Sequence, residues 1–236
     1  GNPYPRLQDA SINNKKGILN ALGLPGPGLN QFLKEVPYSE LWKFKRPLGI
    51  SVGGDNKDEY IINIERIENT IKEKQINYFY ELNISCPNTK NGGTICQNPD
   101  ILESLLFRLR HFLGKVISIK VSPDVSNKTL LKIGEVASSF EKIIINAGNT
   151  KYVSPIEVNV DASNFSMAGG GLSGAPIFAR TLEMVHLFSN FNVPIMATGG
   201  ISNIDQVNAA KSSGASLFGI ATGLVLNPYC LSLIHI

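Results

Sequence analysis

Short apolar runs alternate with amphipathic segments along most of the chain. The runs are rich in β-branched and aromatic residues, which favour strands, and each ends near a polar residue or a glycine. They cover residues 17–24, 47–54, 78–85, 116–121, 142–147, 194–199 and 216–221. The segments with apolar residues at helical spacing lie between them, at 29–42, 56–74, 99–113, 127–140, 175–191 and 203–213. We therefore expect seven strands alternating with helices, the first helix being broken near Pro37.

Three segments fall outside this alternation. Residues 1–16 hold turn formers and polar residues, which predicts a loop or a small hairpin. Residues 150–173 are rich in Asn, Ser and Gly, and we expect a hairpin that lies over one end of the molecule. Only a short tail, residues 223–236, follows the last strand.

A repeat of roughly thirty residues is typical of right-handed βα units in a parallel sheet. Both a doubly wound sheet and a (β/α)₈ barrel fit this repeat. A Rossmann-type sheet should carry G-x-G-x-x-G after its first strand, and this chain has no such motif. Polar or small residues instead stand near the carboxyl end of nearly every strand, where the loops of a barrel converge. We therefore predict an α/β fold of the (β/α)₈ TIM-barrel class, one strand short, with residues 1–236 as a single domain.

Composition narrows the class of protein. A hydrophobic fraction of 43% with 17% charged residues is ordinary for a globular protein and excludes disorder. The net charge of +3 is dispersed, so we expect no nucleic-acid partner. Three scattered cysteines argue against a disulfide framework and for a reducing, cytoplasmic location. No apolar stretch approaches the length of a membrane span.

The stretch YFYELNISCPNTKN, residues 78–91, becomes polar while it should still be strand. Alternation places Glu81, Asn83 and Ser85 on one face. Cys86 follows at once, and Pro87 ends the pairing. A buried structural cysteine at a strand end is the ordinary interpretation. The polar neighbours favour a functional thiol.

Lys120 in VISIKV shares the inward face with Ser118. A lysine that points into a barrel is costly unless it meets an anion. One interpretation is a structural ion pair with Glu81 on the adjacent strand, and the other is a cation held against an electron-rich ring or a phosphate. The two are compatible.

Glycine-rich strand ends predict phosphate binding, because small residues let backbone N–H groups approach an anion. The candidates are Gly169–Gly174, Gly199-Gly200 and Ala221-Thr222-Gly223, the last two lying after the final strands, where barrels usually bind phosphate. Converging amides predict recognition of a planar ligand that carries both carbonyl and N–H groups. The amides are Asn20, Asn83, Asn88 and Asn146.

These motifs resemble one family. GNPYPR at the start, NALGLP at Asn20–Pro25, NISCPN at Asn83–Asn88, IKVSP at Ile119–Pro123, GGLSG at Gly170–Gly174 and TGGI at Thr198–Ile201 are similar to dihydroorotate dehydrogenase, in the same order. The resemblance implies an FMN-containing (β/α)₈ barrel that oxidises dihydroorotate to orotate in pyrimidine synthesis. It further implies a homodimer, and an additional electron-transfer subunit is possible within the family. The electron acceptor stays open between fumarate, a quinone and a partner iron–sulfur flavoprotein.

The resemblance also implies a role for each matched residue. Cys86 would be the base, as in the soluble class 1 enzymes. The four asparagines would hold the pyrimidine ring and its carboxylate, and Lys120 would face the pyrimidine end of the flavin. Further cofactor contacts are implied for these residues: Ser51, Asn83, Asn146, Gly171, Gly174, Gly199, Gly200, Ala221 and Thr222.

Several departures from the family keep alternatives open. The family's first strand, a lysine just before GNPxPR and the final helix are missing, which favours a fragment of a longer protein. Ala147 stands where the family has Ser or Thr. Cys96 lies near the place of the acidic cysteine of dihydropyrimidine dehydrogenase, although an ordinary loop thiol is the simpler interpretation. The alternatives are therefore an FMN oxidoreductase for another dihydropyrimidine and a non-catalytic flavin-binding remnant.

Overall fold

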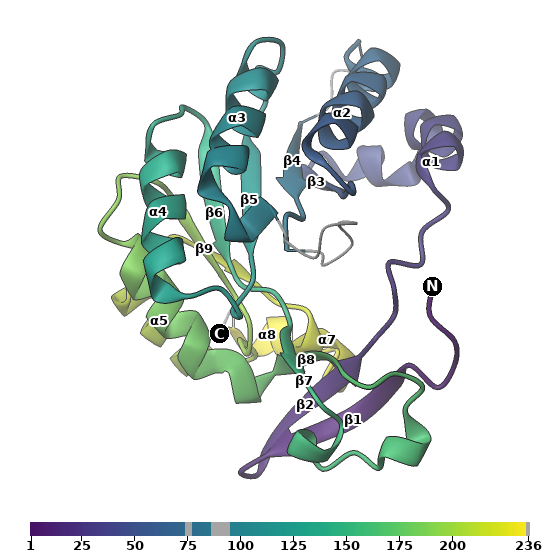
Figure 1. Ribbon diagram of the computed structural model, residues 1–236, viewed down its shortest axis with the longest axis vertical. Helices are drawn as coiled ribbons and strands as arrows, with labels where there is room; N and C mark the ends of the chain where they lie inside the picture. Colours follow the sequence, from purple (N-terminus) through teal and green to yellow (C-terminus); the bar gives the residue numbers. More distant parts are fainter. Residues whose placement is uncertain (74–76, 86–94, 235–236) are drawn as a thin grey trace.

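The chain forms two sheets, one parallel and curled, the other small and antiparallel (Figure 1). The structure is a computed structural model and describes residues 1–73, 77–85 and 95–234. Within these residues, six parallel strands lie in the order β10-β9-β6-β5-β4-β3, and four strands form the small sheet in the order β1-β2-β8-β7. The parallel sheet with its covering helices is an α/β half-barrel, which confirms a partial (β/α)₈ fold.

The parallel strands are short and follow one another through helices. They are β3 (Leu48–Val52), β4 (Tyr78–Leu82), β5 (Ile117–Val121), β6 (Ile143–Ala147), β9 (Ile195–Thr198) and β10 (Leu217–Gly219). The helices are α1 (Leu29–Glu35), α2 (Lys57–Ile71), α3 (Pro99–Arg110), α4 (Asn127–Ser138), α5 (Phe178–Phe188), α6 (Ile204–Ser212), α7 (Thr222–Leu226) and α8 (Cys230–Ile234). Short 3₁₀ turns are η1 (Val36–Tyr38), η2 (Glu40–Phe44), η3 (Ile95–Gln97), η4 (Ile156–Val158), η5 (Ala162–Asn164) and η6 (Ala175–Ile177). The break expected near Pro37 is therefore present, between α1 and η1.

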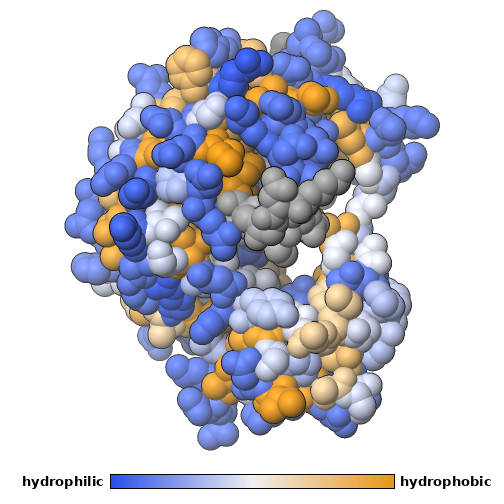
Figure 2. Space-filling model, in the orientation of Figure 1, coloured by the Kyte–Doolittle hydropathy of each residue, from blue (hydrophilic) through white to orange (hydrophobic). Residues whose placement is uncertain are grey.

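The outer face of the parallel sheet is the main core. Helices α2 to α5 cover this face, each turning an apolar stripe toward it (Figure 1). Alternate residues of β5 such as Ile117, Ile119 and Val121 are fully buried there. The inner face carries polar side chains among apolar ones, and Glu81 and Lys120 lie there as the alternation predicts. In the space-filling view, the surface over α3 and α4 is mainly hydrophilic (Figure 2).

Side-chain caps define where several helices begin. Asn56 accepts a hydrogen bond from the backbone N–H of Glu59 at 3.0 Å, and Ser126 accepts one from Thr129 at 3.2 Å. Asn203 and Gln206 form a reciprocal capping box at the start of α6. Such caps pair N–H groups that the helix itself leaves free, and α6 therefore begins at Ile204, directly after its cap Asn203.

The small sheet corrects one sequence expectation. The sequence predicts a barrel strand over residues 17–24, but β2 (Lys15–Asn20) pairs antiparallel with β1 (Leu7–Ile12) and β8 (Gly170–Gly174). A two-residue turn at Asn13 and Asn14, both in the left-handed region, joins β1 to β2. The described barrel strands therefore number six rather than seven, and β3 and β10 are the sheet edges.

The predicted 150–173 hairpin is present. β7 (Lys151–Val153) pairs antiparallel with β8, and β8 joins this hairpin to β2. The four-stranded sheet has its own small core around Leu19, Val158 and Leu172. None of the helices in the described part of the chain is long and apolar enough to cross a membrane.

Candidate functional site

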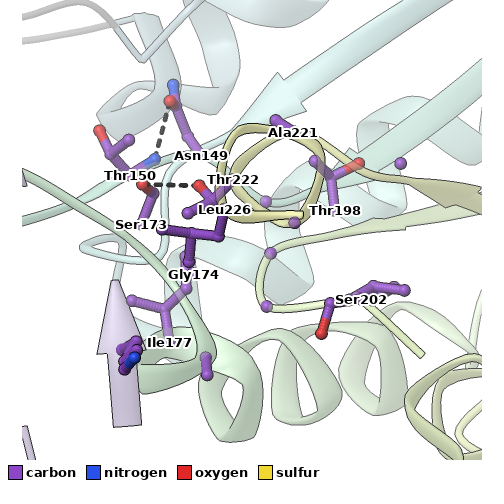
Figure 3. A pocket seen from close by; sticks show the side chains of 18 of the residues that line it. Asn149, Thr150, Ser173, Gly174, Ile177, Thr198, Ser202, Ala221, Thr222 and Leu226 are labelled. Atoms are coloured by element: carbon purple, nitrogen blue, oxygen red, sulfur yellow. Dashed lines mark hydrogen bonds between the residues drawn. The ribbon is translucent and has the colours of Figure 1, made fainter. Parts of the chain in front are cut away.

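A cavity of about 260 Å³ lies where the carboxyl ends of the parallel strands meet the small sheet. Its lining comes from β5, from the loops after β6, β9 and β10, and from β2 and β8 (Figure 3). The residues that bear on its chemistry are Lys16, Lys120, Asn149, Thr150, Ser173, Gly174, Thr198, Gly199, Gly200, Ala221, Thr222 and Gly223. Six residues predicted from the sequence as cofactor contacts thus share one cavity: Lys120, Gly174, Gly199, Gly200, Ala221 and Thr222.

Two glycines are required for the walls of this cavity to close. A Cβ at Gly148 would lie 1.4 Å from the carbonyl oxygen of Thr198, so the loop after β6 passes directly against the end of β9. Gly200 has a φ of +76°, and a Cβ there would lie 2.7 Å from the Cβ of Phe178. Backbone therefore lines this part of the cavity at close range, as an anion site requires.

Lys120 is held from the neighbouring strand. Its Nζ lies 3.7 Å from Oε1 of Glu81, and the lysine side chain is 27% exposed. The second oxygen of Glu81 accepts a hydrogen bond of 2.8 Å from Nδ2 of Asn146 on β6. The ion pair expected from the sequence is confirmed, and Lys120 also lines the cavity.

Three polar atoms on the inner face are buried without a hydrogen-bond partner in the described structure. They are Oγ of Ser118, Oδ1 of Asn146 and Oγ1 of Thr198, one each on β5, β6 and β9. Buried polar groups in folded proteins are almost always paired, so each orphan needs an explanation. A polar ligand at this face would supply the missing partners.

The cavity lining also carries hydroxyls, an amide and a second lysine. Thr222 donates a hydrogen bond of 2.8 Å to Oγ of Ser173, and Asn149 Oδ1 accepts one of 2.8 Å from the Thr150 backbone (Figure 3). Lys16 comes from β2 of the small sheet. Sequence reasoning missed Lys16 and Asn149, because only the pairing of β2 with β8 and the course of the loop after β6 bring them to the cavity.

Comparison with known proteins decides the family. The sequence model described as dihydroorotate dehydrogenase matches residues 1–235. The catalytic subunit of dihydroorotate dehydrogenase B (NAD(+)) from Malacoplasma penetrans is 34% identical over 246 residues, which is 99% of this chain and 74% of that protein. The chain belongs to the dihydroorotate dehydrogenase family.

Other relatives agree with this assignment to dihydroorotate dehydrogenase. The corresponding subunit from Bacillus mycoides is 32% identical over 239 residues, covering 97% of this chain and 71% of the relative. Crystal structures of DHODH from Eimeria tenella, one with ferulenol and one ligand-free, have a TM-score of 0.78 at 21% and 22% identity. They cover 99% of this chain and 69% and 71% of the compared chains, and they support the fold. The chain is therefore placed among oxidoreductases that act on dihydroorotate.

Dihydroorotate dehydrogenases depend on a flavin, and the cavity fits such a group. A flavin offers an electron-rich ring system with carbonyl and N–H groups, which suits Lys120 and the orphaned hydroxyl of Thr198 in the cavity lining. The lining among described residues contains two lysines and no carboxylate. A negatively charged ligand is therefore favoured over a cation.

The remaining residues predicted from the dihydroorotate dehydrogenase motifs lie elsewhere. Asn20 Nδ2 donates 3.0 Å to the carbonyl oxygen of Gly171, within the small sheet. Ser51 and Asn83 share a second, open cavity of about 590 Å³, and Asn83 Oδ1 accepts a 3.3 Å hydrogen bond from Asn149. Cys86 and Asn88 lie outside the described residues.

Cys96 is a core thiol and does not lie in an open loop. It belongs to η3, is fully buried, and its pKa is raised to about 11, chiefly because burial penalises the thiolate. Hydrogen bonds with the Ser122 backbone and the Ser85 side chain offset only part of this rise. A thiol that holds its proton at neutral pH is a poor base, which weakens the interpretation that placed an acidic cysteine here.

Proposed function

We propose that this chain is an FMN-binding domain that oxidises dihydroorotate to orotate in pyrimidine synthesis. The observation that carries the proposal is the cavity itself, which brings together Lys120, the glycine turns after β9 and β10, and the orphaned hydroxyl of Thr198. The family assignment supplies the substrate, and the cavity supplies the reason to place a flavin at this end of the half-barrel.

Two groups of lining residues suit the two ends of FMN. Gly174, Gly200 and Thr222 would hold the phosphate, with Lys16 as a nearby cation. Lys120 would stabilise negative charge at the pyrimidine end of the ring system. Bound FMN would supply an acceptor for the hydride that leaves dihydroorotate.

The substrate side of the proposal rests on amides and a thiol. Asn20, Asn83, Asn88 and Asn146 would bind the pyrimidine ring and its carboxylate, since each amide both donates and accepts. Cys86 would remove a proton from the carbon next to the one that loses hydride. An ordinary Cys has a pKa of about 8.5, so only a minor fraction is thiolate at neutral pH. The rate of dihydroorotate oxidation should therefore rise with pH.

A visible absorption spectrum tests the proposal most directly. The purified chain, supplied with FMN, should be yellow and should bleach when dihydroorotate is added without oxygen. A Cys86→Ala variant should bind FMN and bleach far more slowly. A chain that takes up no FMN, or one that stays yellow with dihydroorotate, contradicts the proposed function.

The relatives suggest which proteins this chain assembles with. The relatives from M. penetrans and B. mycoides are catalytic subunits of an NAD(+)-type enzyme. We accordingly propose a homodimer of this chain that passes electrons to a separate electron-transfer subunit. Light scattering of the chain alone would test the dimer, and NAD(+) reduction only in the presence of an added electron-transfer subunit would test the acceptor.

A further inference from the structure

Glu81 connects three strands on the inner face of the parallel sheet. It lies on β4, pairs through Oε1 with Lys120 on β5 at 3.7 Å, and accepts through Oε2 a 2.8 Å hydrogen bond from Asn146 on β6. Its side chain is 17% exposed, so solvent competes little for either oxygen. Of these three residues, Lys120 is part of the cavity lining, whereas Glu81 and Asn146 lie behind it.

The carboxylate fixes which way the Asn146 amide points. An ionised carboxylate only accepts hydrogen bonds, so the amide must turn its NH₂ group toward Glu81. The carbonyl oxygen Oδ1 is then directed away, and it is the atom that is buried without a partner among the described residues. Asn146 is only 3% exposed, so water is a poor substitute for that partner.

The same carboxylate also balances the charge beside the cavity. Lys120 and Asn146 are direct register partners on β5 and β6. Glu81 therefore holds a cation with one oxygen and orients an acceptor with the other, so the two inner-face groups act as a unit. A glutamine could not serve both donors, because one of its two terminal atoms is itself a donor.

We propose that Glu81 is a positioning residue that presents the Lys120 ammonium and the Asn146 carbonyl oxygen together to a bound flavin ring. This rests on the proposed function and goes beyond it, since it assigns a role to Glu81, which does not line the cavity. The Lys120 ammonium favours a ligand atom that accepts a hydrogen bond or gains negative charge. The Asn146 carbonyl oxygen favours an N–H donor next to that atom.

An exchange of the carboxylate and the amide tests this arrangement. Glu81→Gln leaves Lys120 and Asn146 competing for one acceptor, and Asn146→Asp places two carboxylates against each other. Each single variant should raise the dissociation constant for FMN about tenfold, as mispaired buried polar groups do. In the double variant, the amide introduced on β4 donates to the carboxylate introduced on β6. The second oxygen of that carboxylate still faces the ligand, and the total charge is that of the wild type. FMN affinity should therefore return to within about threefold of the wild type.

The measurement is quenching of flavin fluorescence as apoprotein is titrated into FMN, with folding checked by circular dichroism. Glu68→Gln is the matched control, because Glu68 is a carboxylate on the other side of β4 that accepts hydrogen bonds from Tyr78 and Tyr80. It should lower the thermal midpoint and leave FMN affinity unchanged.

Each outcome bears on the proposal. Recovery of affinity in the double variant supports it, even where a single variant fails to fold. Additive losses in the double variant, unchanged affinity in Glu81→Gln, or a double variant that does not fold would each overturn it, because the exchanged pair should make the same bonds. A wild type that binds no FMN overturns the proposed function and, with it, this inference.

Discussion

Ile119 and Lys120 are neighbours on β5, yet they belong to opposite sides of the parallel sheet. Ile119 is fully buried beneath the helices, whereas the side chain of Lys120 is 27% exposed and lines the cavity. The outer face is closed by packing, whereas the inner face borders the cavity at Lys120. We therefore expect stability to depend on one side of this strand and ligand binding on the other.

Two carboxylates show the same contrast. On the outer side of β4, Glu68 accepts 2.8 Å hydrogen bonds from the hydroxyls of both Tyr78 and Tyr80. Burial and the nearby Glu68 carboxylate raise the pKa of each tyrosine well above its ordinary value, so both hydroxyls remain protonated donors. On the inner side, Glu81 is paired, but Asn146 beside it keeps an orphaned oxygen. A polar network completed by protein atoms supports the fold, and one left incomplete indicates a ligand site.

The largest effect should come from breaking the outer face. Ile119→Ala removes a buried side chain from a packed core, and we expect a loss of about 2–5 kcal/mol in the free energy of unfolding. Urea denaturation measures this loss. The folded fraction should bind FMN as the wild type does. A stable Ile119→Ala variant with weakened FMN binding would contradict the separation of the two faces.

The next effect comes from the adjacent residue on the inner face. Lys120→Ala should lower the rate of dihydroorotate oxidation about a hundredfold or more, the usual cost of losing one preorganised charge partner at a reacting centre. Its unfolding free energy should change by about 1 kcal/mol or less, because the ion pair is long at 3.7 Å and its lysine side chain is 27% exposed. Lys115→Ala is the control, since Lys115 lies over the ring of Tyr78 on the outer side and should leave the rate unchanged. Equal rates of dihydroorotate oxidation in the two lysine variants would show that Lys120 does not take part in the reaction.

Alternation along single strands could be predicted from the sequence, because it depends on neighbouring residues alone. The inward placement of Glu81 and Lys120 and their ion pair follow from period-two geometry on adjacent strands, and both are confirmed. The turn at Gly199-Gly200 and the cap at Asn203 follow from local backbone chemistry in the same way.

Features that depend on non-local pairing could not be predicted. Residues 17–20, GILN, read equally well as a barrel strand and as the middle strand of an antiparallel sheet, and only pairing with β1 and β8 decides between them. That error concealed Lys16, which reaches the cavity from β2. The bond between Asn146 and Glu81 spans β4 to β6 across β5, so it required the strand order.

A smaller effect is expected from Lys16, which lines the cavity from β2. Lys16→Ala should weaken FMN binding about fivefold, near 1 kcal/mol, because an exposed charge pair is worth little in water. Riboflavin, which lacks the phosphate, should bind both proteins equally. Lys15→Ala is the matched control, since Lys15 precedes Lys16 on β2, is exposed and is absent from the cavity lining. The difference should shrink at high salt, and an equal loss for riboflavin would show that Lys16 does not act on the phosphate.

The smallest expected effect concerns the thiol of Cys96, which is buried in the main core. Burial raises its pKa from 9.0 to about 11, so the unfolded chain releases this proton at lower pH than the folded chain. The thiol's contribution to stability is thus fully present below about pH 9 and is lost as the pH rises toward 11. Between pH 8 and 9.5 the wild type should lose at most about 1 kcal/mol from this group. Cys96→Ala has a constant cavity cost, which cancels when slopes are compared, so its unfolding free energy should fall less steeply over this range. Equal slopes, or rapid alkylation of Cys96 in the folded protein at pH 8, would show that the thiol is not the closed, protonated group that its burial implies.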